Sequence, residues 1–251
     1  MPVHEIRHSF HDELDEIMRD ITRLAAYVTE AIPRGTEALL ANDLQAAQEI
    51  IDQDDVIDRL AIETEERCYT TLALQAPVAS DLRAIIAAIR LIAEIERSAD
   101  LMTNVCKATR RIYPIELPPA VRGLLQQMSE EATKLFRMCM DAYVDGDAGL
   151  AAALDDIDDR LDELHKDYIQ EVLTWGGGGG DIQPAVQLAL IGRYYERIGD
   201  HAVNIGERVR YMVDGWLPEQ AGAARAGAST PAWTDGDDIP ASGDDRGAPE
   251  G

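Results

Sequence analysis

The sequence predicts an all-α fold of two tandem, pseudo-symmetric three-helix bundles, and three observations support this. Apolar residues recur at steps of three and four along most of the chain, which is the spacing of amphipathic helices. No segment shows the alternation of apolar and polar residues that marks a β-strand. A short motif near residue 96 returns near residue 196. The six long helices therefore divide into two copies of one unit.

Prolines and turn residues divide the first half into three helices. They are expected over residues 8–41, from the turn at 42–43 to about residue 74, and from about residue 80 to about residue 112. Pro33 lies within the first helix and is expected to kink or interrupt it, because proline removes a donor and clashes with the preceding turn. Asp43 and Ser80 are the expected N-caps of the second and third helices, since both offer a side-chain oxygen.

The second half repeats this organisation after a short linker at Pro118 and Pro119. Helices are expected over roughly residues 119–144, 147–175 and 181–213, with a five-glycine hinge at 176–180. The predicted domains are residues 1–115 for the first unit, 116–217 for the second unit and 218–251 for a tail. That tail has seven acidic and two basic side chains among many Pro, Gly, Ala and Ser residues, so it is predicted to be disordered.

Charge and composition exclude several classes of function. The chain has a net charge of −24, and −19 remains without the tail, so direct binding to nucleic-acid phosphates is not expected. Its three cysteines are widely spaced and are predicted to be reduced, buried thiols of a cytoplasmic protein. The charged N-terminal residues are not expected to form a signal peptide, and no apolar run reaches about 18 residues. Any role at a membrane would therefore depend on a partner.

The repeated motif places acidic side chains on one face of a helix. Residues 96–100 and 196–200 both begin with Glu-Arg and end with Asp, and each Asp is followed four residues later by Asn. Positions four residues apart lie along one side of a helix, where like charges repel. The residues concerned are Glu96, Asp100 and Asn104 in the first copy and Glu196, Asp200 and Asn204 in the second.

A second acidic pair lies on the preceding helix of each unit. These pairs are Asp54 with Asp58 and Asp158 with Asp162. If the paired helices are antiparallel neighbours, four carboxylates converge in each unit, with an Asn amide beside them. Such an oxygen-rich site suits Mg²⁺, Mn²⁺, Ca²⁺ or iron. A solvated acidic helix face is the usual meaning of one such pair, especially with 47 acidic residues in the chain, but the matched repetition favours a metal site.

Other candidate residues indicate no catalytic site. His165 and His201 neighbour the acidic motifs in sequence but point off the carboxylate face, so we expect them to be surface or structural residues. Arg97, Arg193 and Arg197 could bind an anion, although neutralisation of neighbouring carboxylates is the favoured interpretation. The sequence contains no phosphate-binding glycine motif and no Ser or Cys nucleophile with an obvious base. We therefore expect that the protein is not an enzyme.

These motifs together resemble the PhoU family of phosphate-transport accessory and regulatory proteins. The resemblance covers about residues 5–215 and depends on residues 10–14, 77–83, 95–100 and 195–205. Four features depart from the family pattern. Ser98-Ala99 stands where the second copy has Ile-Gly, Pro33 lies within the first helix, the five-glycine hinge is atypical, and the acidic tail is additional. The first of these departures puts the equivalence of the two acidic sites in question.

The resemblance implies a function as well as a fold. It implies a negative regulator of the phosphate-starvation response and of high-affinity phosphate uptake, acting between the ATPase subunit of a phosphate ABC transporter and a phosphate-sensing histidine kinase. It also implies a homodimer and bound divalent or ferric ions, with Mg, Mn, Fe or Zn as candidates. The implied metal ligands are Asp54, Asp58, Glu96, Asp100, Asp158, Asp162, Glu196 and Asp200, with Asn104 and Asn204 as less certain ones.

Two alternatives remain open from the sequence. One is a metal-dependent enzyme of the di-iron bundle type, because residues 5–8 contain a Glu-x-x-His spacing, although it occurs only once. The other is a metal-free acidic scaffold, whose paired carboxylates would form salt bridges with neighbouring arginines and with a partner. Metal analysis and an oxygen-consumption assay distinguish these alternatives from the adaptor function.

Overall fold

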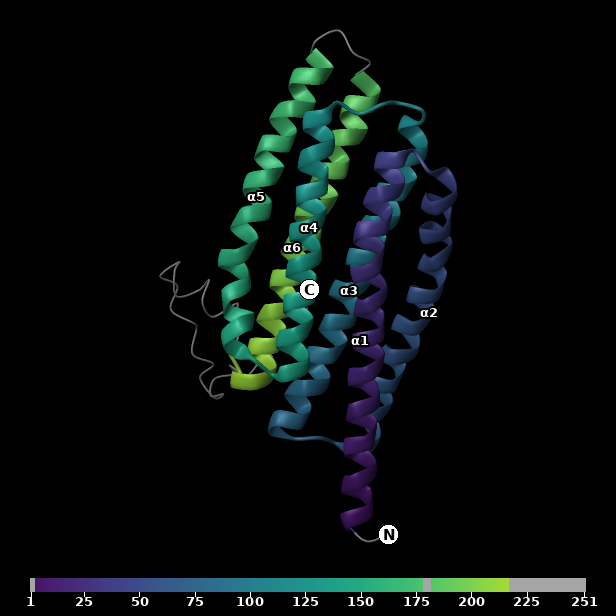
Figure 1. The fold of residues 1–251 in the computed structure, drawn as a ribbon. Coiled ribbons are helices and arrows are strands. Elements are labelled where there is room, and N and C mark those ends of the chain that lie inside the picture. Colours follow the sequence, from purple (N-terminus) through teal and green to yellow (C-terminus); the bar gives the residue numbers. More distant parts are fainter. Residues whose placement is uncertain (1–2, 178–181, 217–251) are drawn as a thin grey trace, which may run out of the picture. The chain divides into compact units, whose positions relative to one another are not determined.

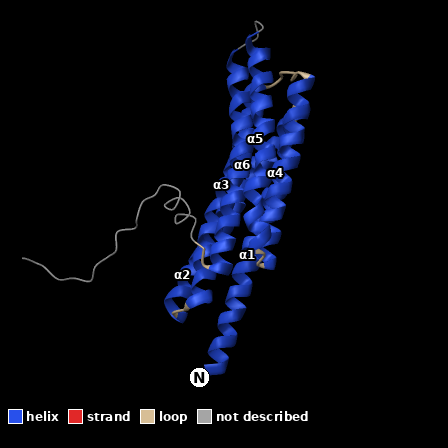
Figure 2. Cartoon of the chain, turned by 90° about the vertical axis from the view of Figure 1, so that its left-hand side faces the viewer, coloured by secondary structure: helices blue, strands red, loops and turns tan. Residues whose placement is uncertain are grey.

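The computed structural model describes residues 3–177 and 182–216, and within these ranges the chain forms six α-helices and no strand (Figures 1 and 2). The predicted all-α fold is therefore confirmed. The helices are α1 (Val3–Ala41), α2 (Leu44–Gln75), α3 (Ala79–Ile112), α4 (Pro119–Asp145), α5 (Ala148–Gly177) and α6 (Ile182–Asp214). None of these described helices is long and apolar enough to cross a membrane.

The helices form two triangular groups that pack side by side. Helices α1, α2 and α3 contact one another, as do α4, α5 and α6. Two further contacts, of α1 with α4 and of α3 with α6, join the groups. Figure 1 shows the consequence: α2 and α5 lie on the outside, and the other four helices lie between them. One face of the bundle therefore presents the order α2, α3, α6, α5.

The joining contacts make residues 1–217 one compact unit. The predicted boundary at residue 115 falls in the connection between α3 and α4. The division into separate units 1–115 and 116–217 remains a prediction. The predicted tail at 218–251 and most of the predicted glycine hinge lie outside the described residues, as do the side chains of residues 5–8.

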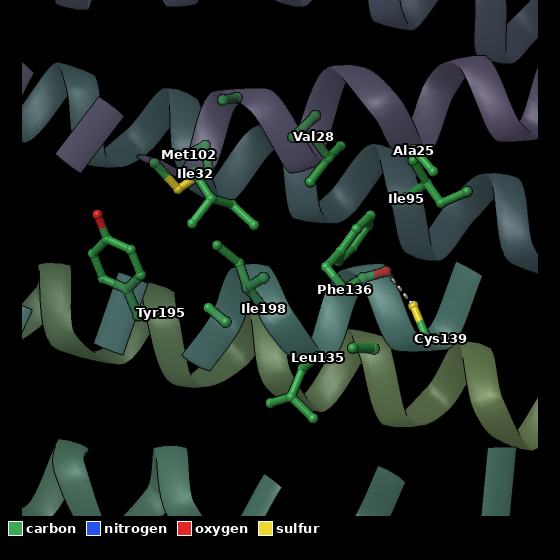
Figure 3. Close-up of a cluster of buried hydrophobic side chains, with 14 of the residues drawn as sticks. Ala25, Val28, Ile32, Ile95, Met102, Leu135, Phe136, Cys139, Tyr195 and Ile198 are labelled. Atoms are coloured by element: carbon green, nitrogen blue, oxygen red, sulfur yellow. Dashed lines mark hydrogen bonds between the residues drawn. The ribbon is translucent and has the colours of Figure 1, made fainter. Parts of the chain in front are cut away.

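The hydrophobic core is formed by all six helices and includes the region between the four central ones. Figure 3 shows Ile32 of α1, Met102 of α3, Phe136 of α4 and Ile198 of α6 pointing toward one another. These side chains are fully buried or nearly so, and the core is mainly aliphatic, as the composition predicts. All three cysteines are free and buried, which confirms the predicted state of the thiols. Burial also raises the pKa of the Cys68 thiol to about 12, which keeps it protonated and unreactive.

A buried group of hydroxyls links three of the central helices. Thr36 of α1 donates to the carbonyl of Ile32 and also lies 2.7 Å from the Ser129 hydroxyl of α4 and 2.6 Å from the Tyr195 hydroxyl of α6. Buried polar groups are costly unless they are hydrogen-bonded. This group therefore specifies how α1, α4 and α6 align.

The predicted N-cap is confirmed for α2 and wrong for α3. Asp43 caps α2, because its carboxylate accepts from the backbone N–H groups of Gln45 and Ala46. The predicted cap at Ser80 is wrong: α3 begins at Ala79, Val78 occupies the N-cap position, and no side chain caps it. The connection spans only residues 76–78, so Ser80 already lies within the first turn of α3. Ala76 begins this connection in a left-handed conformation, and its N–H bonds to the carbonyl of Leu72.

Pro33 does not interrupt α1, which continues to Ala41. Proline within a helix costs about 3 kcal/mol. The turns beyond it bury Ala38 and Leu39 in the core, and this packing offsets the lost hydrogen bond. The expectation of an interruption is therefore wrong, and tertiary packing is the reason.

We predict that Gly206→Ala destabilises the fold by about 1–3 kcal/mol. A Cβ atom at Gly206 of α6 would lie 2.8 Å from the backbone oxygen of Ala151 in α5, so one of the two helices has to shift. Urea unfolding followed by circular dichroism measures the effect. The control is Gly123→Ala in α4, where a Cβ meets nothing within 4 Å and the helix should gain roughly 0.5–1 kcal/mol. Equal effects at the two sites would contradict the close α5–α6 packing.

Candidate functional site

The predicted acidic residues gather in two clusters, one in each group of helices. The first acidic cluster is formed by Asp54 and Asp58 of α2 with Glu96 and Asp100 of α3. In the second acidic cluster, Asp158 and Asp162 of α5 meet Asp200 of α6, and Glu196 lies one turn before Asp200 on the same helix. Because α2 packs on α3 and α5 packs on α6, the carboxylates of each cluster face one another across a helix pair. Both clusters belong to the α2–α3–α6–α5 face.

Mutual repulsion is evident in the first acidic cluster. Burial raises the pKa of Asp58, and the negative charge of Asp100 raises it further. The pKa of Glu96 is raised in the same way, by burial first and then by Asp58 and Asp100. The pKa of Asp54 is also raised, mainly by burial, although a hydrogen bond from the Thr103 hydroxyl opposes this shift. The packing of α2 on α3 therefore holds these carboxylates close enough for their negative charges to repel one another.

The second acidic cluster is more tightly packed. Burial, followed by the charges of Asp162 and Asp200, raises the pKa of Asp158 from its ordinary value of 3.8 to about 7. Asp158 lies against Gly199 of α6, where a Cβ atom would overlap its Oδ1 atom. Within the described part of the chain, Asp158 Oδ1 and Glu196 Oε2 are buried and have no hydrogen-bond partner. These two carboxylate oxygens therefore lose contact with water and gain no hydrogen bond in exchange.

The equivalent position in the first cluster carries a larger residue. Ala99, buried at 3% exposure, stands where the second copy has Gly199. The Asp54 carboxylate accepts a hydrogen bond from Thr103 of α3, whereas Asp158 Oδ1 lies against Gly199 and has no hydrogen-bond partner among the described residues. The two clusters therefore differ in how their buried aspartates are bound.

The donor chemistry of both clusters fits a hard cation. All eight predicted ligands are carboxylates, the kind of ligand that Mg²⁺, Mn²⁺ and Ca²⁺ prefer, and the two unpartnered oxygens are ready acceptors. However, no group of three or more His, Cys, Asp or Glu side chains in the described ranges is already arranged to hold a metal ion. A cation would have to draw the carboxylates together. The metal assignment, including the less certain Asn104 and Asn204, remains a prediction.

Sequence reasoning missed a buried ionic group between α3 and α6. The Glu94 carboxylate of α3 lies 2.6 Å from His201 Nδ1 of α6 and accepts a 3.1 Å hydrogen bond from Asn204. Glu94 is 8% exposed and His201 4%. Arg97 completes the group at 3.2 Å from Glu94. We call this set the α3–α6 ionic group.

Hydrogen bonding dominates the electrostatics of this group. Burial alone would raise the pKa of Glu94, but the hydrogen bonds from His201 and Asn204 outweigh it and lower the pKa below the ordinary value. The expectation that His201 is a surface or structural residue is resolved in favour of the structural role. The signal was a broken repeat: the first copy has Leu101 where the second has His201, and the second has Tyr194 where the first has Glu94.

The remaining candidates lie near the clusters. Arg97 pairs with Glu94, and Arg193 pairs with Glu196, so two of the three arginines neutralise neighbouring carboxylates as predicted. Arg197 is exposed. His165 is half-buried beside the second cluster, and burial lowers its pKa, as does the nearby charge of Arg193.

Comparison with known proteins gives consistent matches. A family model described as "PhoU domain" matches residues 21–109 and 125–209. The chain is 35% identical over 218 residues to the phosphate-specific transport system accessory protein PhoU homolog 1 of Mycobacterium tuberculosis, covering 86% of this chain and 97% of the relative. It is 34% identical over 205 residues to the homolog from Aquifex aeolicus, covering 81% of this chain and 92% of the relative.

Solved structures show the same fold. The crystal structure of PhoU from Pseudomonas aeruginosa matches with a TM-score of 0.78 at 27% identity, covering 82% of this chain and 100% of that one. The phosphate transport system regulatory protein PhoU from Streptococcus pneumoniae matches with a TM-score of 0.77 at 26% identity, covering 83% of this chain and 98% of that one.

We predict that alanine substitution of two glutamates, two positions apart on α3, changes the free energy of unfolding by very different amounts. Glu94→Ala should lower the free energy of unfolding by about 2–4 kcal/mol, because it leaves His201 and Asn204 buried without their acceptor. Glu96→Ala should stay within about 0.5 kcal/mol of the wild type or increase stability, because it removes a repelled charge. Urea unfolding at pH 7 measures both variants. Equal losses would contradict the assignment of Glu94 to the α3–α6 ionic group.

We also predict a pH effect on the chelator-treated protein. The folded-state pKa of Asp158 is about 7 and its ordinary value is 3.8, so the folded state holds the proton more tightly. Stability should therefore fall as pH rises from about 4 to about 7 and then level off. Asp158→Asn should remove this contribution and raise the Tm at pH 8 by roughly 2–4 °C, with little change at pH 4. A Tm difference that does not vary with pH would contradict the shift, and Asp15→Asn, an exposed position in α1, is the control.

Proposed function

The chain belongs to the PhoU family, and from this premise we propose that it is a negative regulator of the phosphate-starvation response and of high-affinity phosphate uptake. In this proposal it is a cytoplasmic, non-enzymatic adaptor. One surface contacts the ATPase subunit of a phosphate ABC transporter, and another contacts a phosphate-sensing histidine kinase. The adaptor acts as a homodimer, and it reaches the membrane only through these partners.

The comparisons support the coarser part of this proposal. The relatives are named accessory proteins of the phosphate-specific transport system, and the Streptococcus pneumoniae structure is titled a regulatory protein of phosphate transport. The matches cover more than four-fifths of this chain and nearly all of each relative. A role as an accessory protein of phosphate transport follows from this similarity. The regulatory direction and the named partners are our inference.

The two acidic clusters are the observation that carries the finer proposal. They lie on one face, between α2 and α3 and between α5 and α6. Crowded carboxylates of this kind raise one another's pKa and favour any positive group that approaches. A cation, or a basic surface on a partner, would therefore bind this face with a gain in electrostatic free energy. An adaptor needs such a surface and no catalytic residues.

We propose that divalent or ferric ions bind at both clusters. Asp54, Asp58, Glu96 and Asp100 would hold one site, and Asp158, Asp162, Glu196 and Asp200 would hold the other. The ion would supply positive charge that neutralises the carboxylates and fixes the spacing of each helix pair. Mg, Mn, Fe and Zn are the candidates. The unpartnered oxygens of Asp158 and Glu196 favour the second cluster as the tighter site.

A metal-free acidic scaffold is the second candidate. It is favoured by the absence of a ready three-ligand group in the described residues and by the arginines that already pair with Glu94 and Glu196. In this case the same face would bind basic partner surfaces directly. The di-iron enzyme has no comparable support, because the Glu-x-x-His spacing occurs only once and the side chains of residues 5–8 lie outside the described residues.

The regulatory role is tested with a reporter of a phosphate-starvation gene in the native host. Deletion of the gene should activate the reporter in phosphate-rich medium, and the wild-type gene should silence it. The variant with Ala at Glu96, Asp100, Glu196 and Asp200 should fail to silence it. The matched control has Ala at Asp15, Glu63, Asp167 and Glu171, which are exposed acids outside the clusters. Full silencing by the cluster variant would contradict a role for the acidic face.

Metal binding is tested separately on purified protein. Mn²⁺ at about a hundredfold excess over its Kd should stabilise the chelator-treated wild type by about 2.7 kcal/mol, or roughly 5–10 °C in Tm. The variant with Ala at Glu96, Asp100, Glu196 and Asp200 should not respond. No response of the wild type to Mn²⁺, Mg²⁺, Fe³⁺ or Zn²⁺, with no metal in elemental analysis, would favour the metal-free scaffold. Pull-down with the transporter ATPase and the kinase then tests the partners in either case.

A further inference from the structure

Three cations line one hollow on α3. Lys107, Arg110 and Arg111 surround a space of about 350 Å³, and only these three residues line it among the described residues. We call this space the basic hollow. Its composition contrasts with the chain as a whole, which has a net charge of −24. Positions i, i+3 and i+4 lie on one side of a helix, so the α3 backbone itself holds the three cations together.

Neighbouring helices position the two arginines without neutralising them. Arg110 donates a 2.9 Å hydrogen bond to the side-chain oxygen of Gln48 in α2. Arg111 donates a 3.3 Å hydrogen bond to the side-chain oxygen of Gln187 in α6. Both acceptors are neutral amides, and none of the three cations is in an ion pair with a described carboxylate. In so acidic a chain, the hollow therefore retains its positive charge.

Stabilisation of the helix end does not account for the hollow. Basic residues in the last turn of a helix interact favourably with its dipole, and Arg110 and Arg111 lie there in α3. The equivalent helix α6 has no basic residue in its last turn. Glu207 and Tyr211 stand at the positions that repeat Lys107 and Arg111. Arg110 alone is repeated, by Arg210, whose guanidinium lies over the Trp216 ring at 3.6 Å from its centroid. The fold therefore forms this helix end in one copy without counterparts of Lys107 and Arg111, so the cluster of three cations calls for a different explanation.

We propose that the basic hollow binds a small tetrahedral oxyanion, and specifically inorganic phosphate. Guanidinium groups donate two parallel hydrogen bonds to such anions, and a lysine ammonium adds a third donor. The acidic surface farther away is screened over about 8 Å at physiological ionic strength, so the local cations dominate. The binding of an oxyanion rests on the hollow alone. The choice of phosphate among oxyanions also rests on the function proposed above.

The basic hollow lies beside the first acidic cluster. Lys107 lies close enough to Asp54 for its charge to act on that carboxylate. A bound phosphate would therefore lie at the end of the first acidic cluster and not of the second. This places an anion site and a candidate cation site next to each other on the same helix pair.

The test is calorimetric titration of inorganic phosphate into the full chain at constant ionic strength. Replacement of Lys107 and Arg110 by Gln should weaken phosphate binding by at least about tenfold, because each cation supplies a charge-assisted hydrogen bond. Sulfate should compete and chloride should not. The control replaces Arg160 and Lys166 of α5 by Gln, which removes the same charge from an exposed surface outside the hollow. This control should bind phosphate as the wild type does.

Three results would overturn the proposal. They are wild-type protein that binds no phosphate at millimolar concentration, equal weakening in the control, and binding to vesicles of anionic phospholipid without binding of free phosphate. Circular dichroism and the Tm of both variants establish that they fold. The outcome is independent of the reporter assay, so failure of phosphate binding leaves the regulatory proposal standing, and failure of regulation leaves the hollow to be judged by its own titration.

Discussion

Repulsion between carboxylates that apolar packing forces together is the constraint on which this structure depends. The buried faces of α2 and α3, and of α5 and α6, pack into the core and fix each helix pair. The acidic side chains on the adjoining faces are therefore held close to one another. Each like-charged pair on one helix costs only a few tenths of a kcal/mol, but burial of Asp158 adds a desolvation cost. Apolar packing in the core offsets this cost in free energy. A bound cation would reduce it by neutralising the carboxylates.

The two halves share a plan but differ in their charged groups. Gly199 admits Asp158 against α6, whereas the first half has Ala99 at the equivalent position. The first half has the basic hollow beside its acidic cluster, and the positions that repeat Lys107 and Arg111 hold Glu207 and Tyr211 in the second half. Between them, the α3–α6 ionic group crosses the junction with a pairing that the repeat itself does not provide. The pseudo-symmetric fold thus has two sites of unequal electrostatic character.

Much of this could be predicted from the sequence, because the relevant signals are local. Helical periodicity and the repeated Glu-Arg motif indicated the six helices. The convergence of acidic residues from α2 with those of α3, and of Asp158 and Asp162 with Asp200, also followed from the sequence, whereas metal binding by them remains a prediction. Pro33 and Ser80 misled because local propensity yielded to tertiary packing in the first case and to a short connection between helices in the second. Contacts between helices distant in sequence were not predictable. Glu94 and His201 are 107 residues apart, and neither belongs to a repeated motif.

The most direct test of the account is a crystal structure of the protein grown with Mn²⁺, with diffraction data collected near the manganese absorption edge. The account predicts anomalous density between Asp158, Asp162, Glu196 and Asp200, and a second peak between Asp54, Asp58, Glu96 and Asp100. Carboxylate oxygens should surround each peak at about 2.1–2.3 Å, as expected for a hard divalent ion. Well-ordered acidic side chains in both clusters with no anomalous density beside them would contradict the proposal that these carboxylates bind a cation.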